Sequence, residues 1–155
     1  MRSQFTKARP REAQYYYETK VIGYYGGATA SYLPITGYTL ERTSTAGFNE
    51  NLGMIAPYNG TIEKVIWRTE IAQDGATSFR VLESADGTEV PGTMTLRCDE
   101  TVDIADDVAH THDLSDPGLG STAITKGRIY AFYLSHASIP YDTNVTIVFK
   151  WDVTS

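Results

Sequence analysis

The strongest structural signal in this chain is the stretch Asn144-Val145-Thr146-Ile147-Val148-Phe149-Lys150-Trp151-Asp152 near the C-terminus. Large apolar residues alternate there with polar ones, and only Val148 interrupts the alternation. Successive side chains of a β-strand point to opposite faces of the sheet, so a period of two is typical of a strand with one buried face. The stretch therefore predicts a strand that packs one face on a hydrophobic core.

Similar strand-forming segments recur from Tyr15 onward. They are rich in Tyr, Thr, Val and Ile, which fit a pleated surface, and they cover residues 15–17, 21–25, 32–41, 52–56, 61–72, 78–84, 93–97 and 128–135. The dipeptides Asn59-Gly60, Asp74-Gly75 and Lys126-Gly127 predict turns between them. No segment of ten or more residues has the period of a helix. The chain is therefore predicted to be all-β, an antiparallel β-sandwich or jelly roll.

Three segments carry more specific expectations. In 61–72 one face is expected to carry Glu63, Val65, Trp67 and Ile71. Ile62 and Ile66 interrupt that alternation, so the middle of this strand is expected to be covered on both sides. Both faces of 128–135 are apolar, as expected when both are buried. The stretch 99–120 is acidic and poor in apolar residues, which predicts a long surface loop.

The length and the first residues suggest one domain preceded by an arm. A chain of 155 residues is of ordinary size for one domain and needs no disulfide or metal to hold a core. Residues 1–14 contain one large apolar side chain, Phe5, and a helix-breaking Pro10. They are interpreted as an extended N-terminal arm that a partner orders, with plain disorder as the alternative. Residues 15–155 are interpreted as the single β-sandwich domain.

Charge is distributed unevenly between the two ends of the chain. Residues 1–20 carry five basic and two acidic side chains, whereas residues 21–155 carry eight basic and seventeen acidic ones. An acidic body repels polyphosphate, so no nucleic-acid binding by the body is expected. The basic arm suits either nucleic acid or an acidic protein surface, and its charge does not decide between them.

Neither cysteine chemistry nor a membrane is indicated. Cys98 is the single cysteine, which excludes an internal disulfide and a multi-cysteine zinc site, and its neighbours suggest an ordinary strand residue. No apolar run approaches the roughly 20 residues that cross a bilayer, and no secretory signal is recognised, so a soluble chain is expected.

No catalytic motif is present, and no cofactor is expected. His110-Thr111-His112 places two imidazoles on one face of an extended segment, where a metal site is conceivable. The third histidine, His136, has no matching motif near it, so His110 and His112 are interpreted as solvated loop residues. No serine lies in a G-x-S-x-G elbow, and no glycine-rich loop has the spacing of a phosphate site. The chain is therefore expected not to be an enzyme.

Eleven tyrosines are the remaining signal. Tyr15, Tyr16, Tyr17, Tyr24 and Tyr25 cluster between the arm and the body. Tyrosine combines a rigid apolar ring with a polar tip and is enriched at protein interfaces. Docking on a neighbour and packing of alternate rings into the core are equally consistent with this pattern, and a sugar-binding platform is a third option.

Four segments of the C-terminal two-thirds form a distinctive series of strands and turns: 56–65 (APYNGTIEKV), 79–81 (FRV), 125–132 (TKGRIYAF) and 144–151 (NVTIVFKW). In this series the chain resembles small virion proteins of tailed bacteriophages. The resemblance covers roughly residues 52–152 and is a pattern of strands and turns. Such proteins have jelly-roll, tumour-necrosis-factor-like domains that usually form trimers, and serve as capsid decoration (cement) proteins or as knobs of fibres. Arg128, where an acidic residue is common, and the acidic stretch 99–120 depart from the pattern.

The resemblance implies a decoration protein that binds and stabilises a phage head as a homotrimer on the outer capsid surface. Its partners would be major capsid protein subunits and further copies of itself, without membrane or nucleic acid. The arm would supply cations for carboxylates on the shell, and its aromatic residues would fill apolar pockets. The implied partner-binding residues are Arg2, Phe5, Lys7, Arg9, Arg11, Tyr15, Tyr16 and Tyr17. A receptor- or glycan-binding knob of a fibre or tail is the main alternative, and a cupin-like metalloenzyme is a third.

Overall fold

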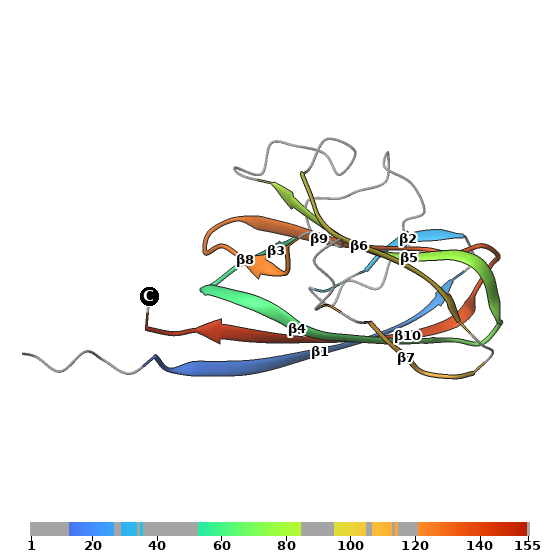
Figure 1. Cartoon of the computed structure of the whole chain (residues 1–155), viewed down its shortest axis with the longest axis horizontal. Coiled ribbons are helices and arrows are strands. Elements are labelled where there is room, and N and C mark those ends of the chain that lie inside the picture. Colours follow the sequence, from blue (N-terminus) through green and yellow to red (C-terminus); the bar gives the residue numbers. More distant parts are fainter. Residues whose placement is uncertain are drawn as a thin grey trace, which may run out of the picture.

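The computed structural model describes residues 13–26, 29–33, 35, 53–84, 95–104, 107–112, 114 and 121–154. These residues form ten strands and no helix. The strands make two antiparallel sheets that lie face to face, so the all-β sandwich predicted from the sequence is confirmed (Figure 1).

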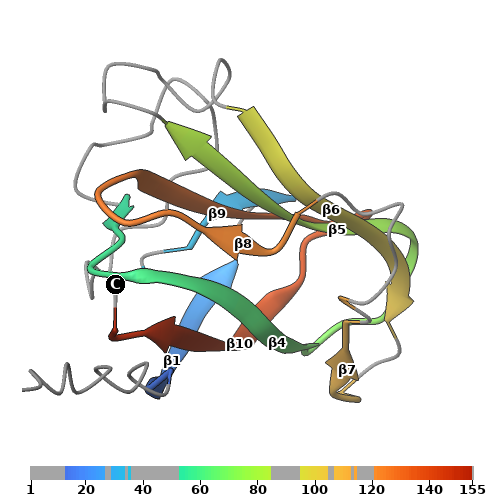
Figure 2. The ribbon, with the colours of Figure 1, turned by 60° about the vertical axis from the view of Figure 1, so that its left-hand side comes forward.

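Sheet A lies at the bottom of Figure 1 and sheet B above it. Sheet A runs in the order β1 (Tyr15–Gly26), β10 (Tyr141–Asp152), β4 (Asn59–Thr69) and β7 (His110–Thr111), with β8 (Ala123–Ile124) also pairing with β4. Sheet B runs in the order β2 (Ala30–Tyr32), β9 (Ile129–Ser135), β5 (Gln73–Ser84) and β6 (Thr95–Ile104), with β3 (Met54–Ile55) also pairing with β9. Figure 2 shows β1 and β7 at opposite sides of sheet A.

The pairing of the strands is nested. β5 pairs with β6, β4 with β7 and β8, β2 and β3 with β9, and β1 with β10, so the first half of the chain is laid antiparallel along the second half. Taking the short pairs β2/β3 and β7/β8 each as one interrupted strand gives two four-stranded sheets. This is the arrangement of a jelly roll, which confirms the finer form of the predicted fold.

The core lies between the sheets and follows the predicted alternation. Val145, Ile147, Phe149 and Trp151 of β10 are all buried, and they face Phe79, Val81, Phe132 and Leu134 of sheet B. The opposite face of β9 is also covered, because Ala131 packs with Tyr32 and Leu82 in a second, smaller cluster. Ile129 and Tyr133 on that face are half-buried, so the expectation that both faces of β9 are buried is confirmed only at Ala131.

β4 departs from the predicted alternation because it contains a β-bulge. Its pairing with β10 shifts between Lys64 and Ile62, so that Glu63 has no partner in the register. A bulge inserts one residue and reverses the facing of the side chains beyond it. Ile62 and Val65 are therefore both buried while Glu63 is exposed, and Ile71 lies beyond the strand, exposed in the turn. The prediction that Glu63 and Ile71 share one face of the strand with Val65 was therefore wrong.

Two of the three predicted turns were also wrong. Asn59 and Gly60 open β4, and Gly60 is required because a Cβ there would lie 2.4 Å from the carbonyl oxygen of Lys150 on β10. Asp74 and Gly75 lie within β5, where the register with β6 is irregular, and the chain turns earlier, between Thr69 and Gln73. The turn at Lys126-Gly127 is confirmed, with Gly127 at φ +80°.

The prediction of a long loop over residues 99–120 was wrong for residues 99–104, which belong to a strand. β6 continues to Ile104 along β5, and β7 follows at His110. β6 is the last strand of sheet B, and charged residues are common on such edge strands, so acidity does not argue against a strand there. Cys98 pairs with Val81 in this ladder, as expected for a strand residue. Most of the extended segment expected at 32–41, and the connection at 85–94, lie outside the described residues.

Candidate protein-binding face

The arm joins the sandwich at the start of β1. The backbone N–H of Val153 donates a hydrogen bond of 3.0 Å to the carbonyl oxygen of Gln14, so the ladder between β1 and β10 extends to that residue. The predicted arm residues Arg2, Phe5, Lys7, Arg9 and Arg11 lie outside the described residues. Of the predicted partner-binding set, the structure therefore places the three tyrosines at the beginning of β1.

Those three tyrosines are exposed. Tyr15, Tyr16 and Tyr17 have relative exposures of 54%, 57% and 57%, so none of them packs into the core. The buried Ile22 marks the inner side of β1, which places Tyr16 on the inner side and Tyr15 and Tyr17 on the outer side of sheet A. The Lys150 ammonium lies 4.4 Å from the centroid of the Tyr15 ring, a cation–π contact that holds this ring against β10.

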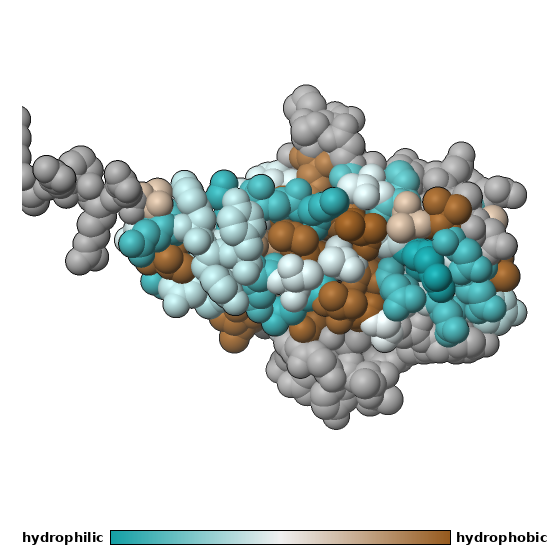
Figure 3. Space-filling view, turned by 90° about the horizontal axis from the view of Figure 1, so that it is seen from below, coloured by the Kyte–Doolittle hydropathy of each residue, from teal (hydrophilic) through white to brown (hydrophobic). Residues whose placement is uncertain are grey.

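Apolar side chains continue from these tyrosines across the outer face of sheet A. Val21 of β1 is 72% exposed and pairs with Thr146 of β10, which pairs in turn with the half-buried Ile66 of β4. The half-buried Val148 of β10 pairs with Thr19, the preceding residue of β1 on this face. Figure 3 looks onto this side of the molecule and shows hydrophobic side chains gathered near its middle, between polar ones. We use the name outer face for the surface formed by Tyr15, Tyr17, Val21, Val148 and Ile66.

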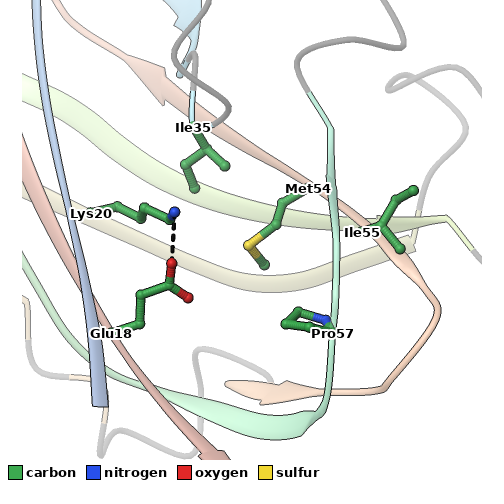
Figure 4. A pocket seen from close by; sticks show the side chains of 6 residues that line it. All are labelled: Glu18, Lys20, Ile35, Met54, Ile55 and Pro57. Atoms are coloured by element: carbon green, nitrogen blue, oxygen red, sulfur yellow. Dashed lines mark ion pairs between the residues drawn. The ribbon is translucent and has the colours of Figure 1, made fainter. Parts of the chain in front are cut away.

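On the inner side of β1, two charged residues line a small pocket (Figure 4). The Lys20 ammonium lies 2.7 Å from the Glu18 carboxylate, which also accepts a 2.9 Å hydrogen bond from the indole N–H of Trp151. Partial burial alone would raise the pKa of Glu18, but the hydrogen bonds from Lys20 and Trp151 and the charge of Lys20 lower it. Glu18 is therefore held ionised at the edge of the sheet.

The pocket itself is too small for a typical ligand. Its other walls come from Ile35, Met54, Ile55 and Pro57, and its volume is about 180 Å³, below the roughly 300 Å³ at which ligand sites begin. Sequence reasoning did not single out Glu18, Lys20 or Val21. The signal that identifies them is the alternation of the charged Glu18 and Lys20 with Thr19 and Val21 directly after the tyrosines of the same strand.

The two neighbouring histidines are not solvated loop residues, contrary to the sequence interpretation. β7 pairs with β4 at Trp67, and the N–H of His112 donates to the carbonyl oxygen of Val65, so the His112 side chain turns into the sandwich. His112 is only 4% exposed and meets the Trp67 ring edge-on, with centroids 3.8 Å apart. Burial lowers the pKa of His112 to about 3, which keeps the imidazole neutral.

The other histidines do not complete a metal centre within the described ranges. The rings of His110 and His112 lie 5.5 Å apart, but no group of three or more His, Cys, Asp or Glu side chains comes together in the part of the chain that the structure describes. His136 is buried elsewhere, and burial lowers its pKa to about 4. A shallow groove beside His112 is lined by Ile62, Glu63, Lys64, Thr111, Leu114 and Thr122.

One buried carboxylate of the described region has a structural role. Glu83 of β5 is 4% exposed and accepts hydrogen bonds from the Tyr130 hydroxyl at 2.6 Å and from Arg128 at 2.9 Å. The Tyr130 oxygen in turn accepts from the backbone N–H of Thr125 at 2.8 Å. Because β9 and the preceding turn supply these partners, the network ties both of them to β5.

Comparison with known proteins assigns no family to this chain: no family model, no curated protein and no solved structure matches it. The resemblance to phage virion proteins stays a prediction from the sequence pattern. Within the described ranges, no helix is long and apolar enough to cross a membrane.

Proposed function

We propose that this chain is a structural virion protein, a decoration (cement) protein that binds and stabilises a bacteriophage head as a trimer through its N-terminal arm. The observation that supports this most is the exposure of Tyr15, Tyr16 and Tyr17 where the arm meets the sandwich. Rings that are more than half exposed leave apolar area that a partner can cover. The proposed activity is adhesion, with the sandwich as a rigid block behind the contact.

The positive charge of the arm favours binding to an acidic surface. Residues 1–14 carry four basic side chains, Arg2, Lys7, Arg9 and Arg11, against one acidic side chain, Glu12. Cationic side chains pair with carboxylates, and Arg does so with two parallel hydrogen bonds. In the proposal these cations meet an acidic surface of the capsid subunits, while Phe5 and the tyrosines fill apolar pockets on it.

Three copies of the arm account for tight binding without a large contact for each. When a first arm is bound, the others bind at a high effective concentration, so modest single affinities combine into strong attachment. The acidic body, with seventeen acidic and eight basic side chains in residues 21–155, stays away from an acidic shell. In the proposal, the arms therefore bind the capsid surface while the acidic bodies stay at a distance from it.

Removal of the arm tests the proposal. A chain that begins at Ala13 is expected to lose binding to undecorated phage heads, measured by co-sedimentation, because the cations and Phe5 are gone. Its thermal unfolding midpoint is expected to stay that of the full chain, because Gln14 and everything after it keep their sheet contacts. Undiminished binding of the shortened chain to heads would contradict the proposal.

The tyrosines are tested separately. Replacing Tyr15 and Tyr17 with Ser is expected to weaken head binding by roughly tenfold or more, since aromatic anchors at interfaces commonly contribute over 1 kcal/mol each. Tyr58→Ser is the matched control, because Tyr58 is also exposed (38%) but lies outside β1. Equal losses from both variants would show that the tyrosines of β1 have no special role.

A further inference from the structure

β1 is a long and regular edge strand. It has twelve residues, pairs with β10 without a register shift, and is the first strand in the order of sheet A. Edge strands are commonly protected by proline, by a bulge or by inward-pointing charges, because an exposed edge pairs readily with another chain. β1 contains no proline, and its inward charges, Glu18 and Lys20, are ion-paired with each other.

The direction of the backbone groups follows from one hydrogen bond. The N–H of Val153 donates to the carbonyl oxygen of Gln14, so even-numbered residues of β1 direct their backbone groups towards β10. Odd-numbered residues direct theirs to the other edge, which no described strand occupies. Residues 15, 17, 19, 21 and 23 therefore offer backbone donors and acceptors to a further strand.

The sequence of β1 is complementary to itself in one antiparallel register. In a pairing centred on Thr19, Glu18 lies opposite Lys20 of a second copy, and Lys20 lies opposite its Glu18. Tyr17 lies opposite Val21, an aromatic and β-branched pair that stabilises sheets. The odd-numbered residues also meet one another, which the hydrogen-bonded pairs of an antiparallel ladder require.

The neighbouring registers are disfavoured by charge. Moving the second strand by two residues in one direction places Glu18 opposite Glu18, and moving it in the other direction places Lys20 opposite Lys20. Like charges directly opposite each other destabilise a sheet. A shift by one residue opposes odd with even positions and breaks the hydrogen-bond pattern. Charge and backbone direction thus select the register centred on Thr19.

We propose that β1 is a self-pairing edge, through which two copies of this chain join antiparallel about a two-fold axis at Thr19. Sheet A then continues from one copy into the next, held by about ten backbone hydrogen bonds over residues 15–23. The outer faces of the two copies become one surface, because side chains opposite each other in an antiparallel pair share a face. This contact does not depend on the proposed function, and it would link copies that belong to different trimers.

Cysteine cross-linking tests the register directly. In a background with Cys98→Ser, Thr19→Cys is expected to form a disulfide-linked dimer on mild oxidation, because the two Cα atoms would lie about 5.5 Å apart. Tyr15→Cys is the matched control, since its partner would be Gly23 and the two introduced cysteines would be about 27 Å apart. Non-reducing gels give the readout. Absence of a cross-linked dimer of the Thr19→Cys variant, or equal cross-linking of the control, overturns the proposal.

Charge reversal supplies a second test that does not use cysteine. Glu18→Lys and Lys20→Glu are each expected to weaken self-association at least about tenfold. In each variant, residues 18 and 20 have the same charge, so both cross-strand pairs of the dimer bring like charges together. A mixture of the two variants is expected to regain association, since every pair then has opposite charges. Sedimentation of each variant and of the mixture decides the matter. Failure of the mixture to associate, with both variants folded by circular dichroism, contradicts the register.

A third variant separates edge pairing from a loss of folding. Thr19→Pro removes an outward N–H at the centre of the register, and proline is tolerated where the N–H faces away from the sheet. We expect the variant to keep its unfolding midpoint and to lose association. Association that persists overturns the proposal. None of these measurements uses phage heads, so their outcome is independent of the test of decoration.

Discussion

Gly60 lies in β4 opposite Trp151 of β10, and the two strands approach too closely there for a side chain. A Cβ at this position would lie 2.4 Å from the carbonyl oxygen of Lys150 and 2.7 Å from the Trp151 ring. The nearer obstacle is backbone, which cannot rotate away. The glycine therefore serves close approach of two strands, although in the sequence it looks like half of a turn dipeptide.

Gly60→Ala is expected to lower the free energy of unfolding by about 2 kcal/mol, as overpacking commonly does. Denaturation in urea measures it. Gly23→Ala, in β1 of the same sheet, is the control: its Cβ would lie 3.1 Å from the side-chain oxygen of Asn144, which can move. A change within about 0.5 kcal/mol is expected there. Equal effects of the two substitutions would show that the contact with β10 is not the cause.

At the scale of elements, β5 and β9 are joined by a buried polar pair as well as by their ladder. Glu83 and Tyr130 lie opposite each other in the register, and the hydroxyl of Tyr130 donates to the Glu83 carboxylate. Burial, and then this hydrogen bond, raise the pKa of Tyr130, which keeps the hydroxyl protonated as a donor. The same oxygen accepts from Thr125, so the pair also fixes the turn that leads into β9.

Tyr130→Phe is expected to destabilise the fold by about 1–3 kcal/mol, because the buried Glu83 loses one donor and Thr125 loses its acceptor. The urea midpoint gives the change. Tyr133→Phe is the matched control on the same strand, since Tyr133 is half-buried and outside this network. We expect its effect to stay below about 0.5 kcal/mol. If the two substitutions cost the same, the network does not stabilise the pairing of β5 with β9.

At the scale of the whole molecule, the buried histidines make stability depend on pH. Burial lowers the pKa of His112 to about 3 and that of His136 to about 4, from an ordinary value of 6.5. The folded chain thus keeps both imidazoles neutral, while the unfolded chain binds protons below pH 6.5. The stability that the two neutral histidines allow is fully present above pH 6.5. It is lost as the pH falls from 6.5 towards the pKa values of the folded chain.

When the pH falls from about 7 to 5, each of these histidines is expected to lower the free energy of unfolding by about 2 kcal/mol. His112→Phe, which keeps an aromatic ring against Trp67, is expected to remove about half of the loss that the two cause together. Urea unfolding at both pH values, compared with the unchanged chain, measures this difference. An unchanged pH dependence of His112→Phe would mean that His112 is protonated in the folded state.

Local sequence patterns were sufficient for the fold class and for the strands with a clear period. The alternation in β10 and the two apolar faces of β9 each follow from side chains within one strand, because facing alternates with residue number. The all-β class follows from many short strands without a helical period. These are properties of neighbouring residues, so they can be read before any pairing is known.

The features that the sequence did not predict depend on contacts between segments that are distant in the sequence. The bulge at Glu63, the close approach at Gly60 and the burial of His112 depend on β10 and on the pairing of β7 with β4, partners 43 or more positions away in sequence. The outward position of Tyr15 and Tyr17 likewise depends on which face of β1 meets sheet B. A periodic pattern identifies a strand, but the register with its neighbour is set by hydrogen bonds and packing across the sheet, and these form only in the folded molecule.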